Sequence, residues 1–455
     1  MIRHSAAAFV VLGLAATPAG AAEHDAFYWL GQFNKASLVM TVEQGIVPQR
    51  LAGPIAEAVK GVIEAGDAPG GKRPADYLQL EPLLIARAGP DVTRMHSGRS
   101  RQDILATTRR EMMRERALAL ADALDGVRAD LLEQAERHRD AIVPAYTNGV
   151  QAQPTTFGHI MLAFDAVLAR DTERVRQAWV RLDLSPLGSA ALGTSSFPVD
   201  RARLAQLLGF ADVADNSYDA NQLAPFDTEA ELAMIASLVA TTAGQFAQDI
   251  HTQYAQPHPW LMLQEGRLTG PSSIMPQKRN PYGLNVLRLQ ASEAVGLTVA
   301  YLFEAHNVTA GMPDYKRDGA ERAVEAARVT AARWSDVLGG LVLDEARAAA
   351  EVDADWSTTT ELADTLEREA DVPFRLGHHF ASDLVTWGRA HGATPTTIPY
   401  EEAQRIYAEA ARQTGQEQTA LPLDPARFKA VLGARNMVDA AKGSAARNRP
   451  NSRAC

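Results

Sequence analysis

The chain has 455 residues, 46% of them hydrophobic and 22% charged, which is typical of a folded chain with a large core and two or three domains. Its 45 Lys and Arg against 55 Asp and Glu give a formal charge of −10, which argues against a general nucleic-acid binder because such proteins carry a basic face. Aromatic residues make up only 6% and the single cysteine is Cys455, so we expect a mostly helical protein without an internal disulfide, a buried thiol nucleophile or a cysteine-based zinc site.

Residues 1–22 have the three parts of a secretory signal peptide. Arg3 makes the start basic, an apolar run extends over residues 6–16, and small residues precede a cleavage point after Ala21 or Ala22. The run is too short to span a bilayer. We therefore expect an exported, periplasmic protein that is not held in the membrane; the alternative is a frayed, Ala-rich first helix.

Long helices are predicted over residues 103–139, 229–250, 284–304 and 319–343, because apolar residues recur there at helical spacing. The first has one apolar stripe, formed by Leu105, Met112, Leu120, Leu124, Val127 and Leu131. The second is apolar or small on nearly every side, so we expect it in the centre of a bundle or between subunits. Pro and Gly mark the loops between helices, over residues 145–153, 185–199, 257–281 and 306–313.

Three polar segments stand out. Residues 95–103 place two arginines, two serines and a glycine before a helix, which suits an anion site but equally a capped helix start with surface arginines. Residues 146–154 form a patch of amides and hydroxyls that could also be an ordinary turn. Residues 270–281, Gly-Pro-Ser-Ser-Ile-Met-Pro-Gln-Lys-Arg-Asn-Pro, suit a mobile loop that delivers a hydroxyl and a positive charge to an anionic substrate.

Segment 270–281 resembles the signature loop of the fumarase/aspartase superfamily, and its Gln-Lys-Arg-Asn-Pro part is most similar to argininosuccinate lyases. His-Ser-Gly-Arg-Ser-Arg at 96–101, Pro-Leu-Gly-Ser at 186–189, Tyr-Lys-Arg-Asp at 315–318 and residues 360–375 resemble the same family in the same order. The resemblance covers nearly the whole mature chain.

The resemblance implies an all-α, three-domain fumarase/aspartase-type fold with a long central helix bundle. Behind the signal peptide, the implied domains are an N-terminal helical domain at 23–112, the central bundle at 113–356 and a C-terminal helical domain at 357–455. It also implies a homotetramer in which each active site takes its segments from three subunits, and an enzyme that needs no cofactor.

The implied reaction eliminates an amine or oxygen leaving group from a succinyl unit and releases fumarate. Ser272 matches the family's catalytic base, which must act as an alkoxide in a closed, water-excluded loop. Lys278 and Asn280 match the residues that hold the carboxylate on which charge develops, while Arg101 and Gln102 match the segment that holds the other carboxylate. The remaining residues predicted in the site are Thr147 and Asn148 as catalytic groups, and Ser100, Ser273, Gln153 and Tyr315 as substrate contacts. The site is expected to be locally basic through Arg99, Arg101, Lys278 and Arg279.

The chain departs from the family pattern at four positions. Asn148 stands where family members usually carry a histidine, and Asn285 stands where they carry the glutamate thought to orient it. Both members of that pair are therefore neutral amides, which do not transfer protons near neutral pH. Gln102 replaces the usual Asn, and Pro271 replaces a Gly and stiffens the approach to Ser272.

We therefore predict a carbon–nitrogen lyase acting on a small dicarboxylate, an N-substituted aspartate that is argininosuccinate-like or an aminopolycarboxylate of the ethylenediamine-disuccinate type. The alternatives are a true argininosuccinate lyase whose acid is another group or water, and a catalytically silent ligand-binding or structural relative. A metal enzyme has little support, because His251 and His258, or His378 and His379, lack metal-ligand spacing with carboxylates.

Overall fold

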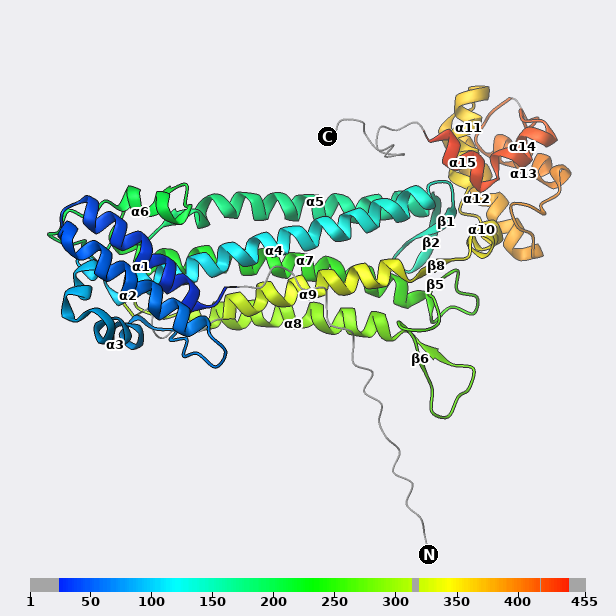
Figure 1. Cartoon of the computed structure of the whole chain (residues 1–455). Coiled ribbons are helices and arrows are strands. Elements are labelled where there is room, and N and C mark those ends of the chain that lie inside the picture. The colour runs from blue at the N-terminus through cyan, green and yellow to red at the C-terminus, as the bar shows by residue number, and fades with distance from the viewer. Residues whose placement is uncertain (1–23, 313–318, 418, 442–455) are drawn as a thin grey trace, which may run out of the picture. The chain divides into compact units, whose positions relative to one another are not determined.

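The computed structural model describes residues 24–312, 319–417 and 419–441 (Figure 1). The predicted signal peptide and Tyr315 lie outside these residues. Helices dominate the described chain, and its strands form only two-stranded sheets. The prediction of an all-α protein is therefore confirmed.

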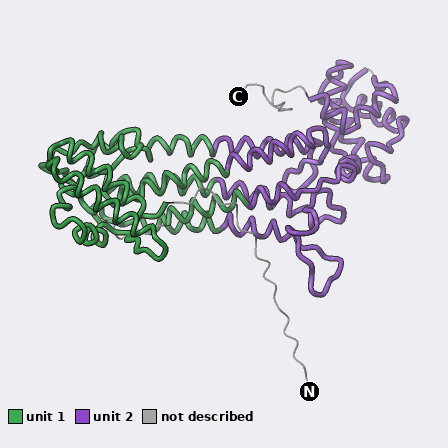
Figure 2. Tube along the Cα trace, viewed as in Figure 1, with its two compact units in different colours: residues 1–123, 172–238, 293–332 green, residues 124–171, 239–292, 333–455 purple. Residues whose placement is uncertain are grey.

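The chain divides into two compact units (Figure 2). Unit 1 consists of residues 1–123, 172–238 and 293–332. Unit 2 consists of residues 124–171, 239–292 and 333–455. The domain boundaries expected near residues 112 and 356 stay predictions.

The short helices of unit 1 enclose an apolar core. They are α1 (Ala26–Glu43), α2 (Gln49–Asp67), α3 (Tyr77–Ala88), the 3₁₀ helix η1 (Pro90–His96) and α6 (Arg201–Leu208), with the parallel strand pair β3 (Leu184–Ser185) and β4 (Asp212–Val213). Aspartate carboxylates start three of the helices by accepting a backbone N–H of the first turn. The core includes the fully buried side chains of Phe33, Met40, Ile55, Leu84 and Met95.

Five of the described helices are longer than 20 residues. They are α4 (Arg101–Arg137), α5 (Phe157–Leu182), α7 (Ala224–Gln253), α8 (Tyr282–Ala305) and α9 (Gly319–Gly339). Helices over 103–139, 229–250 and 284–304 are thus confirmed. The predicted extension of the last helix to residue 343 is wrong, because α9 stops at two glycines and the following β8 (Leu341–Leu343) pairs with β5 (Leu261–Leu263).

Helix α4 has the predicted buried stripe only along part of its length. Leu120, Leu124, Val127 and Leu131 are fully buried. Leu105 and Met112 are half-buried. The periodicity of the sequence therefore locates the buried face in the later part of α4, whereas near the N-terminus other positions are buried, among them Ile104, Ala106 and Met113.

Helix α7 is also largely buried, as predicted for an apolar helix. Residues Asp219–Gln253 are the one described stretch that is long and apolar enough to cross a membrane by length and composition alone, and 56% of its most apolar window is buried within the protein. Leu232, Val239 and Phe246 have almost no exposed surface, whereas Met234 and Leu238 are 46% and 45% exposed. One side of this helix thus leaves apolar surface uncovered in a single chain.

Unit 2 contains the hairpin β1 (Ile142–Thr147) and β2 (Val150–Thr156), so the loop predicted over 145–153 is wrong. A second small hairpin, β6 (Gly270–Pro271) and β7 (Arg279–Asn280), frames the signature loop. The remaining helices complete unit 2. They are α10 (Glu345–Ala354), α11 (Thr359–Ala370), α12 (Phe374–His391), α13 (Tyr400–Gln413), α14 (Pro425–Val431) and α15 (Ala434–Ala440). Among them, α11 to α14 pack around an apolar core that contains Leu366, Phe380 and Tyr407.

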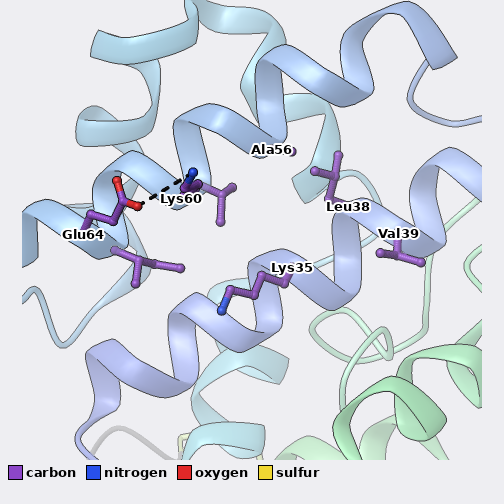
Figure 3. Close-up of a pocket in the computed structure, with 8 residues that line it drawn as sticks. Lys35, Leu38, Val39, Ala56, Lys60 and Glu64 are labelled. Atoms are coloured by element: carbon purple, nitrogen blue, oxygen red, sulfur yellow. Dashed lines mark ion pairs between the residues drawn. The ribbon is translucent and has the colours of Figure 1, made fainter. Parts of the chain in front are cut away.

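A groove of about 290 Å³ lies between α1 and α2 in unit 1 (Figure 3). Leu38 and Val59 contribute to its apolar lining, and Lys60 and Glu64 form an ion pair of 3.9 Å at its side. None of the predicted site residues belongs to its lining. The groove is therefore separate from the candidate site.

Candidate active site

The segment His96–Gln102 forms the entrance to helix α4. Gly98 has a φ of +80°, and a Cβ atom there would lie 2.3 Å from Val199 Cγ2, so only glycine fits. Ser100 then caps the helix, because its Oγ accepts the N–H of Gln102 at 3.2 Å. The segment is thus a capped helix start, which was the alternative interpretation. The cap is compatible with an anion site, because Arg101 remains exposed and Gln102 remains half-buried in the first turn of the helix.

Asp103 ties this helix start to a second predicted segment. Its fully buried carboxylate accepts backbone N–H groups from Ser100 at 2.8 Å, Gly188 at 2.9 Å and Ala190 at 3.1 Å. Burial raises the pKa of Asp103 to about 7, although these N–H groups favour the charged form. The resemblance includes residues 186–189 but does not say what they contact. The structure shows that the backbone N–H of Gly188 in this segment bonds to Asp103. The Ser-x-x-Asp spacing at a helix start is the sequence signal that could have identified Asp103.

Arg101 and Gln102, the predicted carboxylate ligands, both have partners in unit 1. Arg101 Nε donates to Asp76 Oδ2 at 2.6 Å, and its side chain is 43% exposed. Gln102 is half-buried, and its Nε2 donates to the backbone oxygen of Asn221 at 3.2 Å. Asn221 was not predicted in the site. The sequence feature that could have indicated it is Pro225, because a proline four residues after Asn221 cannot donate the helical hydrogen bond to the Asn221 backbone oxygen.

Arg99 does not contribute to an exposed anion site, contrary to the prediction. Its side chain is buried, with Nη1 donating to Ser37 Oγ at 2.9 Å and Nη2 donating to Asn34 Oδ1 at 3.1 Å. The guanidinium also lies 5.3 Å from the centre of the Tyr77 ring. Arg99 therefore anchors the segment to α1 and α3, because burial leaves it no surface for a substrate.

Thr147 and Asn148 lie at the exposed turn of the β1–β2 hairpin in unit 2. Asn148 has a φ of +54° and Gly149 a φ of +76°, as the two central residues of a tight hairpin turn require. Asn is one of the few residues that adopt this conformation readily. Asn148 therefore suits the backbone conformation of this turn. Gln153 is exposed on β2.

Tyr146, next to this turn, anchors the hairpin. Its hydroxyl donates to the Glu351 carboxylate of α10 and accepts the indole N–H of Trp260 at 3.4 Å. Burial, together with the bond to Glu351, raises the pKa of Tyr146 to about 12, so the hydroxyl stays neutral. The turn is therefore exposed but held by half-buried contacts at its base.

The signature loop projects from unit 2, apart from the β1–β2 hairpin (Figure 1). Ser272 Oγ accepts the backbone N–H groups of Ile274 at 3.4 Å and Met275 at 3.1 Å. Two N–H donors aimed at one hydroxyl oxygen stabilise negative charge on it, which an alkoxide base needs. Ser273 is exposed and Ile274 is 82% exposed. The tip of the loop is therefore exposed to solvent.

The charged residues of the signature loop differ in their environment. Lys278 is exposed, while Arg279 Nε donates to Glu265 Oε2 at 3.0 Å and is partly neutralised by it. The backbone of Asn280 pairs with that of Gly270 at the loop base, and its side chain is half-buried. Asn285 is exposed in the first turn of α8. Both cations of this loop are therefore exposed to solvent, and the charge of Arg279 is offset by Glu265.

The predicted site residues fall into two sets. Unit 1 holds Ser100, Arg101 and Gln102, and unit 2 holds Thr147, Asn148, Gln153, Ser272, Ser273, Lys278 and Asn280. Within unit 2 the two hairpins that carry these residues are separate in Figure 1. Among the residues that the structure describes, no group of three or more His, Cys, Asp or Glu is placed to hold a metal ion.

Two family models match the chain: a lyase model over residues 88–296, and an argininosuccinate lyase C-terminal model over residues 356–439. An argininosuccinate lyase of Methanoculleus marisnigri is 35% identical over 445 residues, covering 93% of this chain and 88% of the relative. An argininosuccinate lyase 2 of Agrobacterium fabrum is 33% identical over 423 residues, covering 90% of this chain and 81% of the relative.

Solved structures give the same result. An EDDS lyase in complex with formate superposes with a TM-score of 0.81 at 27% identity, covering 92% of this chain and 82% of the other. A class II fumarase of Schistosoma mansoni, at 16% identity, shares the fold with a TM-score of 0.67 over 90% of each chain. The chain belongs to the argininosuccinate lyase family of the fumarase/aspartase superfamily.

Proposed function

We propose that this carbon–nitrogen lyase, which eliminates fumarate from an N-substituted aspartate, acts on an N-substituted aspartate other than argininosuccinate. An aminopolycarboxylate of the ethylenediamine-disuccinate type is the favoured substrate. The observation that carries the general reaction is the pair of N–H groups directed at Ser272 Oγ within the signature loop. The observation that carries the substrate choice is Asn148 in a tight turn, with Asn285 as the second neutral amide.

The elimination is a balanced proton abstraction and bond cleavage. Ser272, as the alkoxide, takes the proton from the carbon next to a carboxylate, and its Oγ becomes a hydroxyl. The electron pair of that C–H bond forms the double bond of fumarate while the C–N bond breaks and its electrons stay with the amine. Lys278 and Asn280 stabilise the carboxylate on which charge develops, and Ser100, Arg101 and Gln102 hold the other one, with Ser273, Gln153 and Tyr315 as further contacts.

The amides at positions 148 and 285 favour a leaving group that needs no side-chain acid. An alkylamine with a pKa near that of lysine, about 10, is protonated in neutral solution. It leaves as a neutral amine without receiving a further proton. Thr147 and Asn148 would then orient the nitrogen by hydrogen bonding. The likeness to an EDDS lyase, with a TM-score of 0.81, supports this choice.

A second candidate is argininosuccinate itself, because the relatives with 35% and 33% identity are named argininosuccinate lyases. Fumarate absorbance should be followed with argininosuccinate and with a panel of N-substituted aspartates. We expect turnover of the panel and slow or no cleavage of argininosuccinate; rapid argininosuccinate cleavage would favour the second candidate. Fumarate binding without any turnover would identify a silent relative.

Replacing the base tests the mechanism. Ser272→Ala should reduce turnover by at least about a thousandfold without lowering the thermal midpoint. Ser292→Ala is the matched control, since Ser292 is also a serine of unit 2 and its hydroxyl bonds only within α8, to the backbone oxygen of Arg288 at 2.8 Å. An active Ser272→Ala enzyme would refute the assignment of the base.

We further propose that the protein works as an exported homotetramer. Apolar side chains exposed on α7 and α8 support the assembly, with Leu289 at 64% and Phe303 at 75% exposure. The separation of the two hairpins within unit 2 also fits sites completed by another subunit. Light scattering should give a tetramer mass, and native protein should begin at Ala22 or Glu23. An active monomer contradicts the assembly, and retention of Met1 contradicts export.

A further inference from the structure

Helix α7 begins with an irregular turn. Residues Asp219–Leu223 form one turn of π-helix, in which the N–H of Ala224 donates to the oxygen of Asp219, five residues earlier. Pro225 follows as the second residue of α7. Because proline has no N–H, the backbone oxygen of Asn221 cannot receive the bond that an α-helix would give it from four residues on.

The oxygen left available in this way is the acceptor for Gln102. Gln102 Nε2 donates to it at 3.2 Å, although the two residues are 119 positions apart in the chain. One N–H of the carboxamide is thereby engaged, and the second N–H and Oε1 remain available for a ligand. The backbone of Gln102 is held separately by the Ser100 cap.

The acceptor is itself rigid. Asn221 is completely buried, and its side-chain nitrogen donates to the backbone oxygens of Ala190 at 2.8 Å and Ser217 at 3.0 Å. The same nitrogen contacts Ser189 Oγ at 2.9 Å. The segment that these bonds fix is also the one clamped by Asp103. Gln102 therefore points to a fixed partner and has one preferred carboxamide orientation.

We propose that Asn221 is a positioning residue for the substrate, acting through Gln102, and that Pro225 makes its backbone oxygen available. The extra methylene of Gln102, compared with the Asn usual in the family, lets the carboxamide reach this oxygen. The inference rests on the proposed function at one point, which is that Gln102 touches a carboxylate of the substrate. Gln102 would then hold that carboxylate with its second N–H.

The test restores the missing N–H. In Pro225→Ala, the new N–H can bond to Asn221, contract the π turn and compete with Gln102. We expect KM for the substrate to rise about three- to tenfold with kcat nearly unchanged, the size of one lost hydrogen bond. Gln102→Asn should have a similar effect, and the double variant should be no worse than the poorer single variant. Pro425→Ala, at the first turn of α14, is the matched control and should behave as wild type.

The outcomes separate the positioning role from the proposed function. An unchanged KM in Pro225→Ala, or independent effects in the double variant, overturns the inference; Pro225→Ser provides a second variant if Pro225→Ala folds poorly. The crystal structure of the variant gives a readout independent of activity, because the distance from Gln102 Nε2 to the Asn221 oxygen should then exceed 3.5 Å. If wild type releases no fumarate from any substrate, the proposed function fails, and this distance alone decides whether Asn221 positions Gln102.

Discussion

Arg101 Nε donates to Asp76 Oδ2 at 2.6 Å, so the cation expected to bind a substrate carboxylate is paired with a carboxylate of the protein. Asp76 also caps α3, because its Oδ1 accepts the N–H of Leu78 at 2.8 Å. The two functions use different oxygens of one side chain. A substrate carboxylate bound to Arg101 would therefore lie close to the negative charge of Asp76, in a pair that is partly exposed and hence weak.

Asp76→Asn should remove the negative charge of this partner from Arg101 and lower KM by up to about fivefold, the range expected for an exposed ion pair. The cap of α3 is preserved because Asn is as good an N-cap as Asp. Steady-state fumarate release measures the effect. Asp91→Asn is the control, since it removes an exposed Asp that is similarly paired, with Arg94 at 2.7 Å. A KM for Asp76→Asn that equals or exceeds that of wild type would show that the charge of Asp76 does not weaken substrate binding.

Two substitutions of Asn148 can distinguish its structural role in the turn from a chemical role in the site. Asn148→Ala places a Cβ-bearing residue without a polar side chain at a φ of +54° and should lower the free energy of unfolding by about 1 kcal/mol. Asn148→Gly fits this conformation and should cost less than about 0.5 kcal/mol. Urea unfolding compares the two variants. Both variants lack the carboxamide, so both should lose activity equally. Equal stabilities of the two variants would show that the positive φ at position 148 does not disfavour alanine.

Gly158 should be essential for the packing of α5 against the end of α4. A Cβ atom at Gly158 would lie 2.6 Å from the backbone oxygen of Ala135 and 2.9 Å from Arg139 Cα, and backbone atoms cannot turn aside as a side chain can. Gly158→Ala should therefore destabilise the protein by about 1–3 kcal/mol. Gly126→Ala, in open space on α4, should be neutral or stabilise by up to about 1 kcal/mol. Thermal unfolding checks both, and equal midpoints would refute the argument.

Glu229 should make stability depend on pH. Complete burial raises its pKa from 4.5 to about 7, in spite of the nearby charges of Arg109 and Arg110, and Tyr301 donates to it at 3.2 Å. The folded protein keeps this proton up to about pH 7 while the unfolded chain releases it near pH 4.5, so this group's contribution to stability falls as pH rises through that window.

Glu229→Gln removes this titration. Relative to wild type, its free energy of unfolding should increase between pH 5 and 8 by up to about 3 kcal/mol. Glu231→Gln is the control, because it removes the same charge from the same helix, where Glu231 pairs with Arg181 on the surface. Denaturant unfolding at the two pH values gives the difference. A stability difference between Glu229→Gln and wild type that does not vary with pH would rule out the proposed titration.

Much of the fold could be predicted because the signals for it are local. The apolar spacing over 103–139 and 229–250 predicted helices that the structure contains, since helical hydrogen bonds join residues four apart. The hairpin at residues 142–156 was missed, because its polar residues resemble a loop and only the Asn148–Gly149 pair indicates a two-residue turn. The end of α9 was missed because the strand after Gly340 depends on a partner near residue 262.

The sequence by itself determined the helical class of this protein and its superfamily resemblance, and it predicts which residues carry the chemistry, because motifs and periodicity are properties of neighbouring residues. Only the tertiary structure decided what those residues contact. It buried Arg99 against α1, paired Arg101 with Asp76 and joined Gln102 to Asn221, 119 residues away. Such contacts depend on how distant segments pack, and burial and hydrogen-bond geometry then determine which side chains remain available to a substrate.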